Sequence, residues 1–244
     1  MRRQSVTSVP TPTEFTSYSK IVQVRVAIIE LPLGTASGSE ELWSYLDEEA
    51  TAAVRTAGLG RNGFRVGVGR AADMNDLTKV FKRLTGRDVA FSVVTALPGQ
   101  VTPVPVKRQE PEHTIFTFYG DRTVSGADYP PGDYMLNIAC SINEDDPSRV
   151  VLTVMPNIRS TAMETRFASE DGQMGIRTTR ETFNFEPVQF QVILPVKDLV
   201  IVGPGGEAQR SDSIAHHFLL KQRDGITFES VIVMIPEVLT VPIK

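Results

Sequence analysis

The stretch that decides the fold is Val150-Val151-Leu152-Thr153-Val154-Met155-Pro156-Asn157-Ile158. Its β-branched residues favour an extended backbone, and its proline, which has no amide to donate, marks the end of a strand. Further apolar runs of strand length follow at 188–194, 199–203 and 229–238, separated by polar stretches. Strands that follow one another with tight turns between them predict a mostly antiparallel sheet.

The order of these stretches is more informative than any one of them. The first strand ends in proline, Thr179-Arg180-Glu181-Thr182 comes next, a hairpin then ends at Gly203, and the last apolar run ends at Pro236-Glu237-Val238. In that order they resemble the core of the bacterial secretins, the ring-forming outer-membrane channels of secretion systems and pili. The resemblance covers residues 21–31 and 113–238. It implies a structural protein of the cell envelope, in the periplasm or outer membrane, that has no active site.

The chain departs from the secretin pattern in its turns and in its middle. Secretins carry Asp-Gly where this chain has Lys197-Asp198, and Ser213–Lys221 stands in place of their proline- and glycine-rich segment. The region that supplies membrane-spanning hairpins in that family is occupied here by two helix patterns. The resemblance therefore implies a homo-oligomeric ring, or contact with other envelope proteins, without strong membrane insertion by this chain alone.

Composition excludes some partners. The chain has 25 Lys and Arg against 29 Asp and Glu, which gives a net charge of −4 and argues against broad capture of nucleic acid. No apolar run approaches the roughly 18 residues of a spanning helix. The basic start Met1-Arg2-Arg3 is followed by no apolar region. We therefore expect either a chain that is not exported or one whose signal has been removed.

The predicted fold class is α+β, with a mostly antiparallel secretin-like β core. Residues 1–19 are rich in Ser, Thr and Pro and are predicted to be a flexible segment. Residues 20–97 alternate strand and helix patterns and predict a small α/β layer with two helices. Residues 98–112 hold four prolines and predict a linker, and residues 113–244 predict the antiparallel β domain.

The two helices are predicted from capping signals and apolar periodicity. Ser37-Gly38-Ser39-Glu40 fits a capping box, the apolar positions of 42–57 share one helical face, and Gly58 would be the left-handed C-cap. The second helix is predicted over Asp73–Leu84, with Gly86 after it.

One glycine motif raises the possibility of a cofactor. Gly67-Val68-Gly69-Arg70-Ala71-Ala72 stands between a predicted strand and a predicted helix, where glycines let a pyrophosphate approach amides at a helix N-terminus. Asp88 would be the acidic residue expected about 20 positions later. However, Asp88 precedes its strand, and the layer is too small for a doubly wound sheet. We favour a tight strand-to-helix turn and expect no cofactor, which leaves Gly67, Gly69 and Asp88 as the alternative.

The sequence contains few histidine and cysteine residues that could bind a metal ion or act as a nucleophile. The chain has three histidines. His216 and His217 are neighbours in a predicted strand and would face opposite sides of it, while His113 begins another strand. We therefore expect no metal site and no catalytic residues. Cys140 is the single cysteine, which excludes an internal disulfide, and its apolar surroundings in the sequence predict that it packs as a small hydrophobe.

The preferred hypothesis is a non-enzymatic structural or assembly protein that acts through strand pairing and subunit packing. We predict edge strands at 21–31 and 226–235, because unpaired backbone groups are natural joints for a neighbouring subunit. The assembly residues would be Val22, Val24, Val26, Ile28, Phe228, Val231 and Val233.

Two other hypotheses stay open. The first is a soluble, monomeric envelope module that binds a protein or a glycan through loops at 160–175 or 203–213. The second is a nucleotide-dependent enzyme that uses the turn at Gly67 and Gly69.

Overall fold

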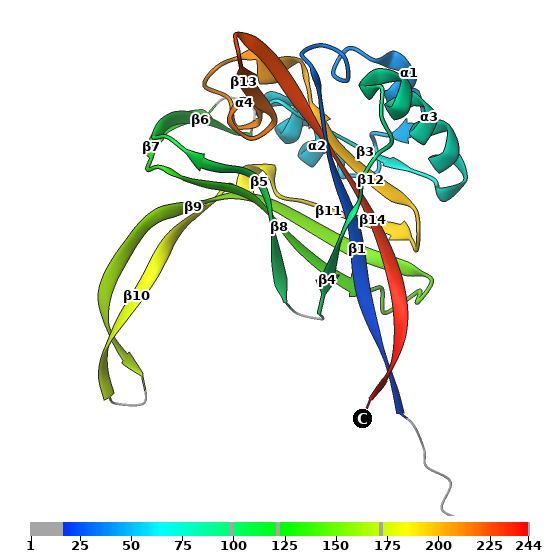
Figure 1. The fold of residues 1–244 in the computed structure, drawn as a ribbon. Helices are drawn as coiled ribbons and strands as arrows, with labels where there is room; N and C mark the ends of the chain where they lie inside the picture. Colours follow the sequence, from blue (N-terminus) through cyan, green and yellow to red (C-terminus); the bar gives the residue numbers. More distant parts are fainter. Residues whose placement is uncertain (1–16, 98–99, 121–122, 171–172, 244) are drawn as a thin grey trace, which may run out of the picture.

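A computed structural model describes residues 17–97, 100–120, 123–170 and 173–243. Two sheets and a layer of helices are stacked on one another (Figure 1). The large sheet has seven strands, in the order β2 (Leu46–Asp47), β3 (Phe64–Gly69), β12 (Leu199–Pro204), β14 (Ile226–Ile243), β1 (Ser17–Pro32) and β4 (Ser92–Ala96), with β13 (Leu220–Arg223) also paired to β14.

The small sheet has five strands, in the order β10 (Gln173–Asn184), β9 (Arg149–Glu170), β8 (Gly132–Ile142) and β5 (Val101–Glu110), with β11 (Phe190–Pro195) also paired to β9. Strands β6 (His113–Tyr119) and β7 (Thr123–Tyr129) form a separate hairpin. The helices are α1 (Glu40–Ser44), α2 (Ala53–Arg61), α3 (Met74–Thr85) and α4 (Ile214–Leu219), with short 3-10 turns η1 (Ala71–Asp73), η2 (Glu186–Val188) and η3 (Gly206–Gln209). The predicted α+β class with a mostly antiparallel β core is confirmed.

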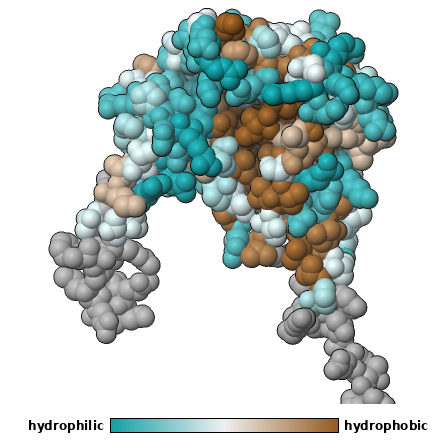
Figure 2. All heavy atoms as spheres, viewed as in Figure 1, coloured by the Kyte–Doolittle hydropathy of each residue, from teal (hydrophilic) through white to brown (hydrophobic). Residues whose placement is uncertain are grey.

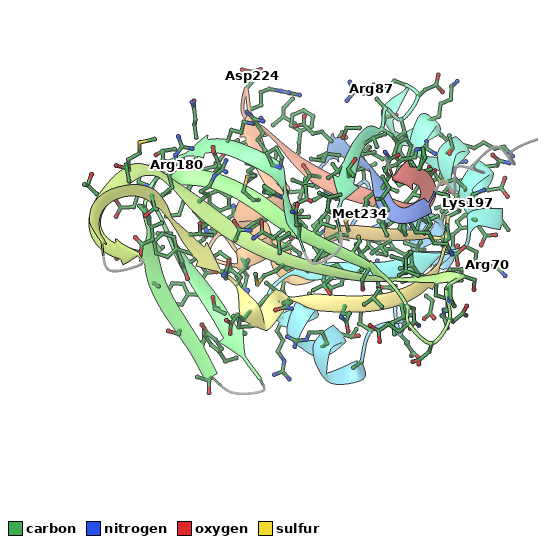
Figure 3. The ribbon with its side chains drawn as sticks, turned by 90° about the horizontal axis from the view of Figure 1, so that it is seen from below. Arg70, Arg87, Arg180, Lys197, Asp224 and Met234 are labelled. Carbon is green, nitrogen blue, oxygen red and sulfur yellow. The ribbon has the colours of Figure 1, made fainter. Side chains whose placement is uncertain are left out.

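The large sheet is buried on both faces. One face packs against the small sheet, where Val24 and Met234 meet residues such as Leu152. Figure 3, seen from below, labels Met234 in this layer between the two sheets. The opposite face packs against α1 and α3, where Ile29 contacts the cluster that contains Trp43. Burial on both faces explains why the strand sequences of this sheet are continuously apolar.

The C-terminal strands lie where the sequence predicts them. The deciding stretch 150–158 lies in β9, the run 199–203 forms β12, and the run 229–238 lies in β14. The last hairpin turns at Asp224 and Gly225, whose φ angles are 53° and 75°, the positive values that such a turn requires. Figure 3 shows Asp224 at the tip of this hairpin.

The first predicted helix is wrong as a single element. Helix α1 ends at Ser44, and α2 begins only at Ala53 and runs past Gly58 to Arg61. Between them Leu46 pairs with Gly69 as part of β2, so sheet pairing overrides the helical periodicity of the segment. The predicted capping box of Ser37 and Glu40 does not form: the N-cap of α1 is Ser39, which accepts from the Leu42 amide at 3.1 Å, and Glu40 is the first helical residue. The prediction that Gly86 follows the second helix is confirmed, because Gly86 ends α3 with a φ of 70°.

Three segments differ from the structure that the sequence predicts. The predicted loop 160–175 lies, apart from residues 171 and 172, which are outside the described residues, in the β9–β10 ribbon, which projects from the small sheet and pairs through its backbone without an apolar pattern (Figure 1). The predicted linker 98–112 contains β5, an edge strand, where prolines are tolerated because the outer side needs no ladder bond. His216 and His217 lie on α4 and not on a strand.

Candidate functional site

The residues predicted to be assembly joints lie on inner strands. Val22, Val24 and Val26 belong to β1, which is flanked by β14 on one side and β4 on the other. All three side chains are buried against the small sheet. The prediction that β1 is an edge strand is therefore wrong. Ile28, which lies beyond the end of the β4 pairing, is 37% exposed.

Strand β14 is also an inner strand. Val233 pairs with β1 on one side and β12 on the other, and Phe228 pairs with β1 and β13. Val231 is fully buried under α1 and α3. An apolar run shows that a strand is buried but not which strands flank it, so the sequence could not identify the edge.

The edge of the large sheet is β4. In the described part of the chain, β4 pairs with β1 alone. The Thr95 carbonyl accepts from the Thr102 hydroxyl at 3.4 Å, so Thr95 directs its backbone groups away from β1. Alternate residues of a strand direct their amide and carbonyl to the same side. The amide and carbonyl of Val93 therefore also face outward and are available to another strand.

An apolar patch lies beside this edge. Val93 is 58% exposed, Leu97 is 42% exposed and Leu239 is 37% exposed. Val93 lies opposite Arg25 and Leu239 lies opposite Ile21. Arg25 and Ile21 share one face of β1, so Val93 and Leu239 lie on the same face of the sheet. Figure 2 shows hydrophobic residues gathered where Figure 1 draws β1, β4 and β14.

Charged and aromatic groups border the patch. The Arg25 guanidinium donates to the Glu237 carboxylate at 3.4 Å and lies 4.6 Å from the centre of the Phe91 ring. Arg25 and Glu237 are both partly exposed, so this ion pair adds at most about 1 kcal/mol to stability. An apolar centre with a polar border is the usual anatomy of a protein interface.

Beyond β4, the pair of β1 and β14 continues as a two-stranded ribbon. The pairing runs to Ser17 opposite Ile243, well past Val22, where the β4 pairing stops. Figure 1 shows this ribbon extending away from the body of the molecule, as the β9–β10 ribbon does. Within the described residues no third strand covers Ser17–Ile21 or its partner segment, so backbone groups on both sides of the ribbon are open.

Packing accounts for the glycines of the dinucleotide-like motif. A Cβ atom on Gly67 would lie 2.7 Å from the Leu46 Cβ, and one on Gly69 would lie 3.0 Å from a Leu46 methyl group. The strand that carries them, β3, is antiparallel to both neighbours, unlike a nucleotide-binding sheet. These glycines make room for β2.

At this turn, a carboxylate of the chain itself occupies the position that the phosphate of a bound dinucleotide would take. The Ala71 amide, at the start of η1, donates to the Asp198 carboxylate at 2.8 Å. Asp88 is exposed and forms an ion pair with Lys82 at 2.9 Å, away from this turn. The three residues of the cofactor alternative therefore do not form one site.

The described residues contain no cluster of potential metal ligands, and their single cysteine is buried. Among the described residues, no group of three or more His, Cys, Asp or Glu side chains could hold a metal ion. Cys140 is buried, as predicted, and burial raises the pKa of its thiol to about 12. In the same part of the chain, no helix is both long and apolar enough to span a membrane.

No family model and no curated protein matches this chain. Among solved structures it is similar to the type IV competence pilus secretin PilQ of V. cholerae, with 12% identity and a TM-score of 0.24 over 91% of this chain and 58% of that chain. The Klebsiella pneumoniae type II secretion outer membrane complex (PulD, PulS and the PulC HR domain) matches at 10% identity and a TM-score of 0.20, over 93% of this chain and 38% of that chain. The InvG secretin domain β-barrel from the Salmonella SPI-1 injectisome matches at 9% identity and a TM-score of 0.21, over 93% of this chain and 61% of that chain. The chain thus spans less than two thirds of each of these chains, and the resemblance is weak and confined to the fold.

Proposed function

We propose that this chain is a non-enzymatic assembly protein of the bacterial cell envelope, and that its copies associate through the β4 edge of the large sheet. The observation that carries the proposal is the outward-facing backbone of Val93 beside an exposed apolar patch. An added strand would gain main-chain hydrogen bonds at the edge and would bury the Val93, Leu97 and Leu239 side chains.

The edge strand of the large sheet, β4, and the edge strand of the small sheet, β5, differ in their capacity to pair with an added strand. Strand β5, the edge of the small sheet, contains Pro103 and Pro105, which have no amide to donate. Proline at an edge is a device that prevents pairing. Strand β4 contains no proline. This difference supports the large sheet as the place where a second copy would add a strand.

The envelope location rests on the order of sequence stretches that resembles the secretin core. In such an assembly each copy would use one surface to accept a neighbour and a different surface to reach the next, which closes a ring when the rotation permits. The β1–β14 ribbon, which projects beyond β4, is the second surface that we propose.

The proposal is tested by two substitutions at the same position. Val93→Pro removes the outward amide without removing a bond to β1, whereas Val93→Thr keeps the amide and the β-branched shape. We expect Val93→Pro to shift the protein towards monomer in sedimentation velocity and Val93→Thr to retain association. Equal association of the two variants would show that the β4 backbone is not the joint.

A further inference from the structure

All three histidines of the chain meet in one pocket. His113 begins β6, and His216 and His217 lie on α4, yet the rings of His113 and His217 have centroids 4.5 Å apart. The rings of His216 and His217 are 5.6 Å apart. The pocket has a volume of about 380 Å³, and Lys107 of β5 and Lys221 of β13 also line it. Two stretches distant in sequence, one of β5 and β6 and the other of α4 and β13, thus bring five basic side chains together.

One of the residues that line this pocket has a buried polar atom without a partner. His217 is 8% exposed, and its Nε2 atom has no hydrogen-bond partner among the described residues. The other two histidine rings each have a polar partner. His113 Nδ1 contacts the Tyr134 hydroxyl at 3.1 Å, and His216 Nδ1 donates to the Ala208 carbonyl at 3.1 Å. A buried polar atom without a partner is costly, which points to a ligand at this position.

Burial and repulsion between the basic groups lower the pKa values of His217 and Lys107 in this pocket. Burial, together with the nearby His113, His216 and Lys107, lowers the pKa of His217 to about 3. Burial also lowers the pKa of Lys107 to about 8, with Lys221 acting in the same direction. The acidic groups that face the cluster are Glu110, which raises the pKa of Lys107, and Asp212, which raises the pKa of His216. Two carboxylates thus face two lysines, so a proton added to the buried His217 ring would have no counter-charge of its own.

We propose that this pocket binds a small anionic group, a phosphate or a carboxylate, and that the His217 ring takes up a proton as the anion binds. The anion would supply the counter-charge for that added proton. Lys107 of β5 and Lys221 of β13 would contribute further donors. Because binding and proton uptake are coupled, affinity for the anion must increase as the pH falls.

Imidazole NMR tests this directly, because three histidines give a spectrum that can be assigned. Sulfate, which keeps its charge over the range used, represents the phosphate class, and acetate represents the carboxylate class. Each is titrated at about pH 6 and about pH 8, on either side of the ordinary histidine pKa. We expect the His217 signals to shift along a saturable curve with at least one probe, with affinity about tenfold higher at the lower pH.

Two substitutions locate the binding. Lys107→Met replaces a half-buried amine by an apolar chain of similar length and is expected to abolish saturation. Lys79→Met removes an exposed lysine of α3 and is the matched control that should bind like the unmodified chain. Where Lys107→Met fails to fold, Lys221→Gln at the exposed rim replaces it, with an expected several-fold loss of affinity.

Each outcome of these titrations supports or overturns one part of the proposal. Saturation by sulfate alone assigns the phosphate class, by acetate alone the carboxylate class, and by both a general anion site. Linear shifts with both probes would overturn the site. Equal affinity at the two pH values would overturn the proton coupling, and unchanged binding in Lys107→Met or its substitute would overturn the location.

Discussion

Val93 lies directly opposite Arg25 in the antiparallel pair of β4 and β1, yet Arg25 does not cover it. The Arg25 guanidinium is directed to Glu237 and to the Phe91 ring, and the Val93 side chain stays 58% exposed. Isolated exposed hydrophobic side chains are common on protein surfaces. This one differs because it adjoins both an open strand edge and other exposed apolar side chains.

The exposed side chain should matter for association and not for stability. We expect Val93→Lys to reduce self-association while the free energy of unfolding changes by less than about 0.5 kcal/mol, because an exposed position makes few contacts. Ile193→Lys is the matched control: Ile193 is 48% exposed on β11, away from the β4 edge, and its substitution should leave association unchanged. Equal effects of the two substitutions on sedimentation would mean that general surface charge, and not this patch, governs association.

A side chain added at Gly67 should destabilise the protein, because there is no space for it beside Leu46. Gly67→Ala places a Cβ 2.7 Å from the Leu46 Cβ, so we expect a loss of about 1–3 kcal/mol in stability measured by urea unfolding. Gly60→Ala, within α2, meets nothing within 4 Å and should stabilise the protein by about 0.5–1 kcal/mol. If Gly67→Ala were as stable as the unmodified protein, the close packing of β2 on β3 would not be the reason for glycine there.

A buried carboxylate holds the segment that leads into α1. Glu229 is fully buried, and one of its oxygens accepts from the Ala36 amide and, at 3.0 Å, from the Ser37 amide. The Trp43 indole donates to the Ala36 carbonyl at 2.8 Å, so the single tryptophan reports on this contact.

Glu229→Ala leaves two amides without an acceptor and should cost about 3 kcal/mol or more. Glu229→Gln, which keeps one acceptor oxygen, should cost less. Urea unfolding followed by Trp43 fluorescence measures both. The reverse order of the two losses would contradict the hydrogen-bonding role and indicate that the charge itself dominates.

Stability should decrease on the acid side of neutrality through His217. Its pKa in the folded chain is about 3, whereas an unfolded histidine titrates near pH 6.5. Between these values the unfolded chain binds a proton that the folded chain does not, so the free energy of unfolding falls as the pH falls through this window.

The contribution of His217 is isolated by comparison with His217→Gln, which cannot titrate. In low-salt buffer without sulfate or acetate, the urea midpoint of the unmodified protein should fall more steeply below about pH 6.5 than that of the variant. Parallel pH profiles would show that His217 titrates normally in the folded protein.

Local signals in the sequence predicted much of the fold. Gly86 and the apolar face of 73–84 identified α3, and Asp224-Gly225 identified the last hairpin, because these signals act within a few residues. The helix predicted over 42–57 failed because Leu46 pairs with β3, a contact that periodicity within the segment does not reveal.

The candidate site was harder to predict for the same reason. The sequence identified a strand at 88–97 but not its position outside β1, because strand order depends on contacts between distant segments. The histidine pocket is not predicted from the sequence, because His216 and His217 are expected on a strand, which would direct their rings to opposite sides. On α4 both rings line the pocket, with His113 brought to them by the chain fold.

The mass of the protein in solution tests the central claim most directly. Light scattering over a concentration series, with and without mild detergent, separates a discrete assembly from a monomer. We predict a discrete assembly of several copies that persists as the protein is diluted through the accessible range and that Val93→Pro dissociates. A monomer under every condition would contradict the proposal that copies of this chain associate through β4.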